Sequence, residues 1–201
     1  MRAAVNQKVR INILRLSALA LVPAVLVIQP MLGLEGFGHE TIESLGILLL
    51  LAGVLGRFWS ILYVGGLKNR VVMQDGPYSM TRNPLYFFST VAATGIGLMF
   101  GAVGFALMIG GTVGVILWLT ARREAAFLSQ EFGPEYDAYA ARTPFFLPDP
   151  RLFRTGRVNS FDASTLRRNL FDAFVFLSFI PLVEMVDQLK LYLHWSLISL
   201  W

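Results

Sequence analysis

One short polar segment carries most of the residues that could do chemistry. It reads Gly-Pro-Tyr-Ser-Met-Thr-Arg-Asn-Pro-Leu-Tyr over residues 76–86, lies between two long apolar stretches, and is called the cassette below. Pro84 suits the first turn of a helix and biases the preceding residue away from helix, so Asn83 is expected to be an N-cap. The helix start and the charge of Arg82 would together attract a carboxylate or phosphate. The alternative is that Arg82 only meets lipid headgroups and Asn83 only caps.

A second cluster of functional side chains lies further along the chain. Four residues fall on one face of an expected helix: Glu124, Phe127, Leu128 and Glu131. Gly133-Pro134 is expected to end this helix and start another, in which Tyr136 and Tyr139 share one side. Residues 143–148 would then run in extended form. The alternative is an amphipathic interfacial helix, with its charges in water and its aromatic rings in lipid.

Three further residues lie inside apolar stretches. A charged residue within a membrane span is costly and is a functional hypothesis by default, so Arg57 is a candidate, with Glu124 as its partner. The alternative for Arg57 is snorkelling toward the nearer membrane surface. Gly95 and Gly97 allow close approach of a ligand or of another helix, and helix packing is the more ordinary use.

Composition places these residues in an integral membrane protein. Of 201 residues, 55% are hydrophobic and 15% are charged, whereas a soluble domain has about 25% charged residues. The mean hydropathy is +0.60. The absence of cysteine excludes disulfides, thiolate metal sites and iron–sulfur clusters, and with two histidines we expect no metal site. We expect no nucleic-acid partner, because membrane topology explains the basic residues.

Apolar stretches of bilayer length predict an all-α, polytopic fold. A span needs about 20 residues. Residues 85–120 carry no charge and are too long for one span, so Gly101 is expected to turn them into a helical hairpin. The predicted spans are residues 13–34, 45–66, 85–100 and 103–120. With the C-terminal part, we expect four to five transmembrane helices in one domain, 1–201, plus a cytoplasmic helical segment after the hairpin.

Charged residues predict the orientation of these spans. The loop between the first two spans carries Glu35, Glu40 and Glu43 and no Lys or Arg, whereas the N-terminus, the cassette and the segment after residue 120 are basic. By the positive-inside rule these basic parts face the cytoplasm, and we expect a bacterial inner membrane. A basic start followed by an apolar run also resembles a signal peptide, although an uncleaved anchor suits the remaining spans better.

Residues 169–201 predict a membrane-associated helix. Two apolar runs, 173–183 and 191–201, are each too short to span, and Glu184, Asp187 and Lys190 separate them. Pro181 would kink a helix here. Either one bent span forms with buried charges, which we favour, or two pieces lie at the interface with Trp195 and Trp201 as anchors.

The ordered set of motifs resembles the isoprenylcysteine carboxyl methyltransferase and phospholipid methyltransferase superfamily. The resemblance covers about residues 45–148. It rests on Arg57-Phe58-Trp59, Gly76-Pro77-Tyr78, Arg82-Asn83-Pro84-Leu85-Tyr86, Glu124, Phe132-Gly133 with Tyr136 and Tyr139, and Thr143-Pro144 with Phe146 and Pro148. Two positions depart from the pattern, since Asn83 replaces a histidine and Ala125 replaces the second glutamate of a pair.

This resemblance implies methyl transfer from S-adenosylmethionine to a lipid-like or membrane-embedded acceptor that offers a carboxylate or an amine. It implies catalytic roles for Arg57 and Glu124 and makes membrane lipids the expected partners. The cofactor-binding residues that it implies are Tyr78, Arg82, Asn83, Pro84, Tyr86, Glu124, Tyr136 and Tyr139. Gly95 and Gly97 are added to this set because glycine allows close approach of a ligand.

Two other functions stay open at this point. A membrane reductase of the sterol-reductase type shares this architecture and would use NADPH. A lipid-binding protein could instead have kept the fold and lost the chemistry together with the glutamate that Ala125 replaces. A transporter is disfavoured, because the chain shows no repeated halves.

Overall fold

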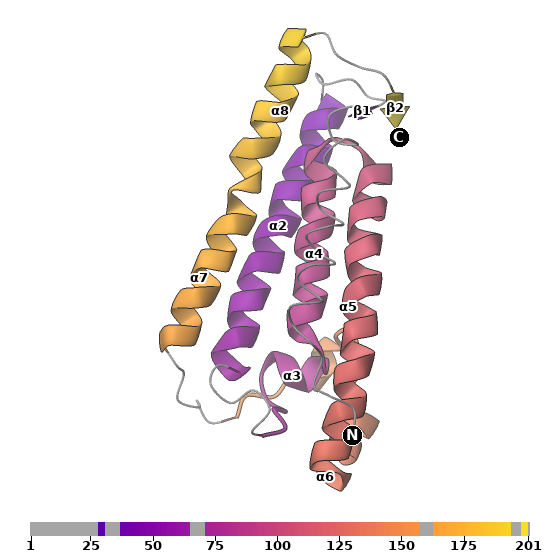
Figure 1. Cartoon of the computed structure of the whole chain (residues 1–201), viewed down its shortest axis with the longest axis vertical. Coiled ribbons are helices and arrows are strands. Elements are labelled where there is room, and N and C mark those ends of the chain that lie inside the picture. Colours follow the sequence, from indigo (N-terminus) through magenta and orange to yellow (C-terminus); the bar gives the residue numbers. More distant parts are fainter. Residues whose placement is uncertain (1–27, 31–36, 65–70, 157–162, 194–197, 201) are drawn as a thin grey trace.

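The computed structural model describes residues 28–30, 37–64, 71–156, 163–193 and 198–200. In this part of the chain the protein is an all-α membrane protein whose long helices lie side by side (Figure 1). Among the described residues, three helices are long and apolar enough to cross a bilayer: Phe37–Val64, Val103–Phe132 and Asn169–Leu189. The predicted first span, 13–34, lies outside the described residues except for Ile28–Pro30.

Helix α2 (Phe37–Val64) begins earlier than the predicted span 45–66. Its first two turns carry Glu40, Thr41 and Glu43, and the Thr41 hydroxyl donates a 2.6 Å hydrogen bond to the Phe37 carbonyl. Acidic side chains near a helix N-terminus interact favourably with the helix dipole. The helix therefore extends beyond the apolar run, which a hydropathy pattern alone does not detect.

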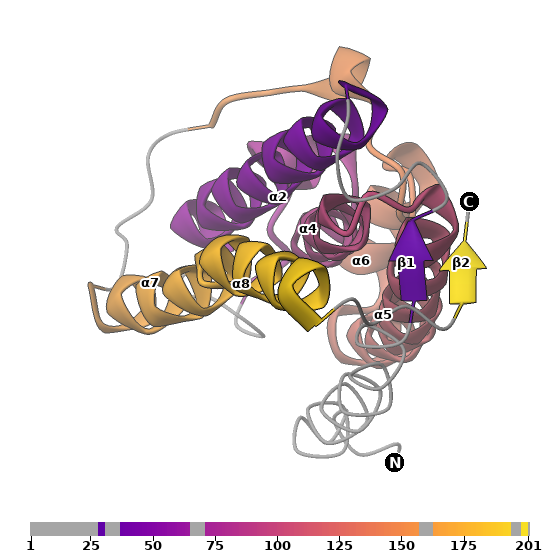
Figure 2. The ribbon, with the colours of Figure 1, turned by 90° about the horizontal axis from the view of Figure 1, so that it is seen from above.

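The predicted hairpin is confirmed. It consists of α4 (Pro84–Met99) and α5 (Val103–Phe132), joined through Gly101, whose φ of 68° lies in the left-handed region that favours glycine. Helix α5 continues past residue 120, where the predicted arm ended, so its last turns carry Glu124 beyond the apolar stretch. Helix α4 packs between α2 and α5 (Figure 2).

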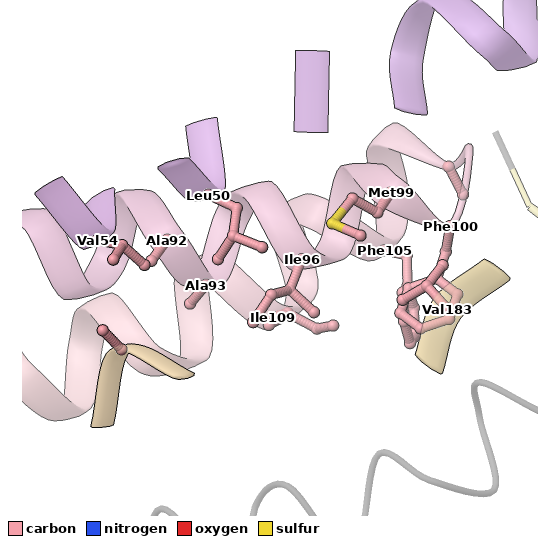
Figure 3. Close-up of a cluster of buried hydrophobic side chains, with 12 residues drawn as sticks. Leu50, Val54, Ala92, Ala93, Ile96, Met99, Phe100, Phe105, Ile109 and Val183 are labelled. Carbon is pink, nitrogen blue, oxygen red and sulfur yellow. The ribbon is translucent and has the colours of Figure 1, made fainter. Parts of the chain in front are cut away.

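The buried core lies between α2, α4 and α5 (Figure 3). Leu50 and Met99 are fully buried there, and the rings of Phe100 and Phe105 meet edge to face with centroids 5.3 Å apart. Small residues bring the helices together, since a Cβ on Gly53 would lie 2.5 Å from the Ala92 backbone nitrogen. This close packing fixes the register of α4, whose start carries the cassette.

The C-terminal part forms α7 (Ala163–Leu177) and α8 (Phe179–Leu193), which follow one another along the bundle (Figure 1). Proline has no N–H, so Pro181 cannot donate to the Leu177 carbonyl, and the helix is interrupted at Ser178. Residues Asn169–Leu189 are apolar and long enough to cross a membrane as one segment. The arrangement agrees with the bent span that the sequence favours.

Two short strands were not predicted. Strand β1 (Ile28–Pro30) pairs in parallel with β2 (Ile198–Leu200), within segments that the sequence assigned to the first span and to the C-terminal helix. Pro30 disfavours helical geometry at Gln29, in agreement with the strand that these three residues form.

Candidate functional site

The cassette folds at one end of the bundle, which we call the cassette end (Figure 1). Its first half is the one-turn helix α3 (Pro77–Met80), preceded by Gly76 at φ 60°. A Cβ at Gly76 would lie 2.4 Å from the Tyr63 ring of α2, so both backbone conformation and space require glycine. Thr81 is extended, and α4 begins at Pro84.

Residues 143–156, which we call the strap, close over the cassette. The strap contains the short 3-10 helix η1 (Pro150–Leu152) and is otherwise non-helical. The chain bends at residue 143 and at residues 145–147, so the extended form predicted for residues 143–148 is only partly present. Three backbone amides pair across the seam, at 2.8 to 3.0 Å: Gly76 to the Arg154 carbonyl, Arg82 to the Pro144 carbonyl, and Asp149 to the Met80 carbonyl. These hydrogen bonds hold the strap against the cassette.

Two hydroxyl side chains of the cassette extend this seam. The Thr81 hydroxyl donates a 3.0 Å hydrogen bond to the Phe146 carbonyl, and the Ser79 hydroxyl accepts one of 2.9 Å from the Arg154 amide. Both residues are buried. Neither residue is identifiable as a site residue from the sequence, because no local spacing distinguishes a serine or threonine that hydrogen-bonds a distant backbone group.

Asn83 occupies the predicted N-cap position, but its side chain does not cap the helix. Its carbonyl accepts from the amides of Tyr86 and Phe87, while its Nδ2 donates a 2.8 Å hydrogen bond to the Phe145 carbonyl in the strap. Because Pro84 has no amide hydrogen, the first turn has fewer donors to satisfy. The prediction of a side-chain cap was therefore wrong, and Asn83 instead holds the strap.

Tyr136 and Tyr139 lie together on the buried side of α6 (Pro134–Arg142), as predicted. Gly133, at φ 54°, ends α5 and lets Pro134 start α6. The two rings lie 6.0 Å apart, and the Tyr139 hydroxyl donates a 2.7 Å hydrogen bond to the Tyr78 carbonyl. Burial raises the pKa values of all three tyrosines, so their phenols are neutral near pH 7.

The guanidinium of Arg82 lies at the centre of this group. It stacks on the Phe145 ring at 5.1 Å. Burial raises the pKa of Tyr136, and the charge of Arg82 and its side-chain hydrogen bond to Tyr136 partly offset this rise. Its Nε is buried and has no hydrogen-bond partner among the described residues. A buried donor without an acceptor costs about 1–3 kcal/mol. An anionic ligand group would satisfy it.

Glu124 and Tyr86 complete the group at the cassette end. Burial is the main cause of the raised pKa of Tyr78, and smaller contributions come from Tyr139, the carboxylate of Glu124 and Tyr86. Glu124 also contributes to the raised pKa of Tyr136, behind burial and Asp137. Together with the hydrogen bond from Tyr139 to the Tyr78 carbonyl, these interactions show that the second cluster lies beside the cassette, as predicted.

Arg57 lies among three helices near the cassette end. Its Nη1 donates a hydrogen bond to the Ser89 hydroxyl of α4, and its guanidinium lies 5.3 Å from the Phe176 ring of α7. Ser89 in turn donates to the Leu85 carbonyl at 2.7 Å. These contacts connect α2, α4 and α7, and the predicted pairing with Glu124 stays a prediction.

Gly95 and Gly97 lie apart from the other predicted site residues and serve helix packing. A Cβ on Gly95 would lie 2.5 Å from the Leu50 backbone nitrogen of α2, and one on Gly97 would lie 2.4 Å from the Ala106 Cα of α5. Both faces are filled by neighbouring helices, which leaves no room for a ligand. Their assignment to cofactor binding is therefore corrected.

Comparison with known proteins identifies the fold's relatives. Residues 42–135 match the phospholipid methyltransferase family. The chain is 34% identical over 144 residues to the nickel-cobalt-cadmium resistance protein NccN of Alcaligenes xylosoxydans xylosoxydans, an alignment that covers 72% of this chain and 67% of that protein. The chain belongs to the phospholipid methyltransferase family.

A second relative gives a similar match. The cobalt-zinc-cadmium resistance protein CzcN of Cupriavidus metallidurans is 33% identical over 144 residues, covering 72% of this chain and 66% of that protein. The chain thus spans about two thirds of the length of each relative. No solved structure matches the chain significantly.

Family membership gives the two departures in the sequence a structural setting. Asn83 stands where superfamily members have histidine, and here its amide is used to hold the strap. Ala125, the residue after Glu124 on α5, is half-buried. Of the expected pair of carboxylates, only that of Glu124 is present beside the tyrosines. In the part of the chain that the structure describes, no cluster of three or more histidine or acidic side chains could hold a metal ion.

Proposed function

We propose that this protein transfers a methyl group from S-adenosylmethionine to a lipid-like acceptor in the membrane. The observation that carries the proposal is the half-buried Arg82, whose Nε lacks a partner among the described residues and which lies beside the neutral phenols of Tyr136 and Tyr139. The family is one of membrane methyltransferases, and the site offers the charges and aromatic surfaces that this cofactor needs.

The residues at the cassette end fit the groups of S-adenosylmethionine. Arg82 would hold the carboxylate, because a charge-assisted hydrogen bond satisfies its buried donor. Glu124 would hold the amino group or the ribose hydroxyls. The rings of Tyr78, Tyr136 and Tyr139 would face the sulfonium, since cations favour aromatic faces, and their raised pKa values keep them as neutral phenols.

The bound cofactor supplies an activated methyl group, so the protein has mainly to align the acceptor and exclude water. The strap supports this role, because its hydrogen bonds to Arg82 and Asn83 cover the start of α4. An ionised carboxylate acceptor needs no base. An amine must lose a proton, and the raised pKa values of the nearby tyrosines make their phenolates scarce at neutral pH. A carboxylate is therefore the simpler acceptor.

We propose that the cassette end faces the cytoplasm of a bacterial inner membrane. It carries five exposed arginines: Arg122, Arg123, Arg142, Arg151 and Arg154. The opposite end of the bundle, at the start of α2, carries Glu40 and Glu43 instead. This asymmetry is the one that the positive-inside rule describes.

The names of the two relatives concern resistance to nickel, cobalt, cadmium and zinc. We extend to this chain the proposal that its methylated product contributes to tolerance of such metals. Esterification of an anionic headgroup removes one negative charge, which weakens the attraction of divalent cations to the membrane surface. Growth on graded cadmium chloride, with the wild type and Arg82→Gln compared in a host lacking the protein, tests this point.

Transfer of isotope-labelled methyl groups to a total membrane lipid extract tests the proposed activity. The purified protein should move label from S-adenosylmethionine into the organic phase, where mass spectrometry identifies the product. Arg82→Gln should abolish most of the transfer, while Arg151→Gln, an exposed arginine of the strap, should retain it. Cofactor binding without transfer to any lipid would favour a protein that kept the fold and lost the chemistry.

A further inference from the structure

The Phe145 ring of the strap lies against the guanidinium of Arg82. The guanidinium carbon is 5.1 Å from the centre of the ring, which is within the range of a cation–π contact. Phe145 is half-buried. The motifs that resemble the family include Pro144 and Phe146 but not Phe145. An aromatic ring at this position is therefore a feature of this chain that the motifs do not explain.

Contacts from α5 and from the cassette fix the Phe145 ring. Trp118 of α5 meets it edge to face, with the two centroids 6.2 Å apart. The Phe145 carbonyl accepts a 2.8 Å hydrogen bond from Nδ2 of Asn83, and the Pro144 carbonyl accepts one of 2.9 Å from the Arg82 amide. The backbone on which the ring stands is thus tied to the residues beside the candidate site. The ring presents a fixed aromatic surface to the guanidinium.

The Arg82 guanidinium is restrained at two points and has an unused donor at a third. Its central carbon lies over the Phe145 ring, and it makes a side-chain hydrogen bond with Tyr136. Its Nε is buried without a hydrogen-bond partner among the described residues. A free arginine side chain samples many rotamers, so a guanidinium that is already held in place loses less entropy when it binds an anion.

We propose that Phe145 is a positioning residue, which holds the Arg82 guanidinium where it can bind the carboxylate of S-adenosylmethionine. The inference rests on the proposed function and adds a specificity determinant for the amino-acid end of the cofactor. Phe145 acts through Arg82, because its own side chain has no charge or donor for a carboxylate. A ligand that lacks this carboxylate should therefore bind equally well with and without the ring.

Calorimetric titration of the detergent-purified full chain with two related thioethers tests the proposal. S-adenosylhomocysteine keeps the amino-acid end of the cofactor, whereas methylthioadenosine lacks it. Phe145→Leu should weaken binding of S-adenosylhomocysteine about fivefold, because the contact between ring and cation is lost. Its affinity for methylthioadenosine should stay that of the wild type. A substitution that only loosened the strap would weaken the binding of both ligands.

Two further strap variants are the controls. Phe145→Tyr keeps an aromatic ring and should retain the wild-type preference for S-adenosylhomocysteine over methylthioadenosine. Phe153→Leu removes a ring that meets Trp59 of α2 at 5.8 Å, and it should bind both ligands as the wild type does. If Phe145→Leu keeps the wild-type ratio of the two affinities, or if Phe153→Leu lowers that ratio equally, Phe145 has no positioning role.

A double-mutant cycle measures whether Phe145 acts through Arg82. In Arg82→Gln no guanidinium remains to be held, so adding Phe145→Leu should cause no further loss of affinity for S-adenosylhomocysteine. An equal loss in the presence and absence of Arg82 would overturn the proposal.

The outcome is distinguishable from that of the proposed function. If the wild type and Phe145→Leu bind S-adenosylhomocysteine equally well, the positioning role fails while the cofactor site stands. If the loss is specific to S-adenosylhomocysteine but no lipid is methylated, the positioning role stands and the proposed chemistry fails. A wild type that binds neither ligand would overturn both.

Discussion

The hydroxyl of Tyr139 donates a 2.7 Å hydrogen bond to the carbonyl of Tyr78, across 61 residues of sequence. The bond is buried and joins α6 to the one-turn helix of the cassette. It holds two of the proposed cofactor-binding tyrosines against each other. The geometry of the site therefore depends on contacts that no single segment of the chain contains.

Tyr139→Phe removes this bond and leaves a buried carbonyl without its donor. We expect a loss of about 1–3 kcal/mol of stability, seen as a lower thermal unfolding midpoint of the detergent-purified protein. Tyr192→Phe is the matched control, because Tyr192 is 82% exposed on α8 and should leave the midpoint unchanged. Equal midpoints for the two variants would contradict the assigned role of the bond.

Gly76→Ala should destabilise the protein more than Gly133→Ala does. Both glycines have positive φ, at 60° and 54°, with ψ of −132° and −129°, so both substitutions carry a conformational cost of about 1–3 kcal/mol. Only at Gly76 does the added carbon also meet the Tyr63 ring, whereas at Gly133 no atom of the described residues lies within 4 Å. Thermal midpoints of both variants measure the difference, and a larger drop for Gly133→Ala would refute this account.

The hairpin and the second cluster could be predicted from the sequence because their signals are local. A charge-free stretch with Gly101 near its middle indicates two helices and a turn, and Gly133-Pro134 indicates a helix stop followed by a start. The early start of α2 was missed, because Glu40 and Glu43 reduce the apolar signal although they suit a helix N-terminus.

The details of the site could not be predicted from local patterns. The Asn83 side chain could cap the helix that directly follows it, yet it donates a hydrogen bond to the carbonyl of Phe145, which lies 62 residues away. Gly95 and Gly97 were assigned to the cofactor from residue type alone, although helix packing was the more ordinary expectation, and packing against α2 and α5 explains them. Such choices depend on which segments meet in space, and sequence spacing does not contain that information.

Arg82→Gln should weaken binding of S-adenosylmethionine at least tenfold, which corresponds to about 1.4 kcal/mol. A solvent-exposed charge contributes about 0–1 kcal/mol, and the guanidinium of Arg82 is instead half-buried with an unpartnered Nε among the described residues. Calorimetric titration measures the change. Arg151→Gln should bind as the wild type does, and wild-type affinity in Arg82→Gln would remove Arg82 from the site.

Glu124→Gln should also weaken cofactor binding, because it removes the negative charge proposed to meet the amino group or ribose. Glu131→Gln is the control on the same helix, since Glu131 is exposed. The two variants should unfold at similar temperatures and differ in affinity in the same calorimetric titration. If both bind equally well, the amino end of the cofactor lies elsewhere.

Stability should decline at alkaline pH because of the buried tyrosines. Their folded-state pKa values are raised above the ordinary value of 10.0, mainly by burial, so the unfolded chain loses these protons first. The contribution is therefore fully present below about pH 10 and is lost as the pH rises further. Thermal midpoints from pH 8 to 11 should fall more steeply for the wild type than for Tyr139→Phe. Parallel curves would count against this cause.

The central claim is that the cassette end binds S-adenosylmethionine, and calorimetric titration of the detergent-purified wild type tests it most directly. Separate titrations with S-adenosylmethionine and NADPH distinguish the methyltransferase from a reductase that shares its architecture. The account predicts saturable one-site binding of S-adenosylmethionine and no binding of NADPH. Binding of NADPH alone, or of neither molecule, would contradict it.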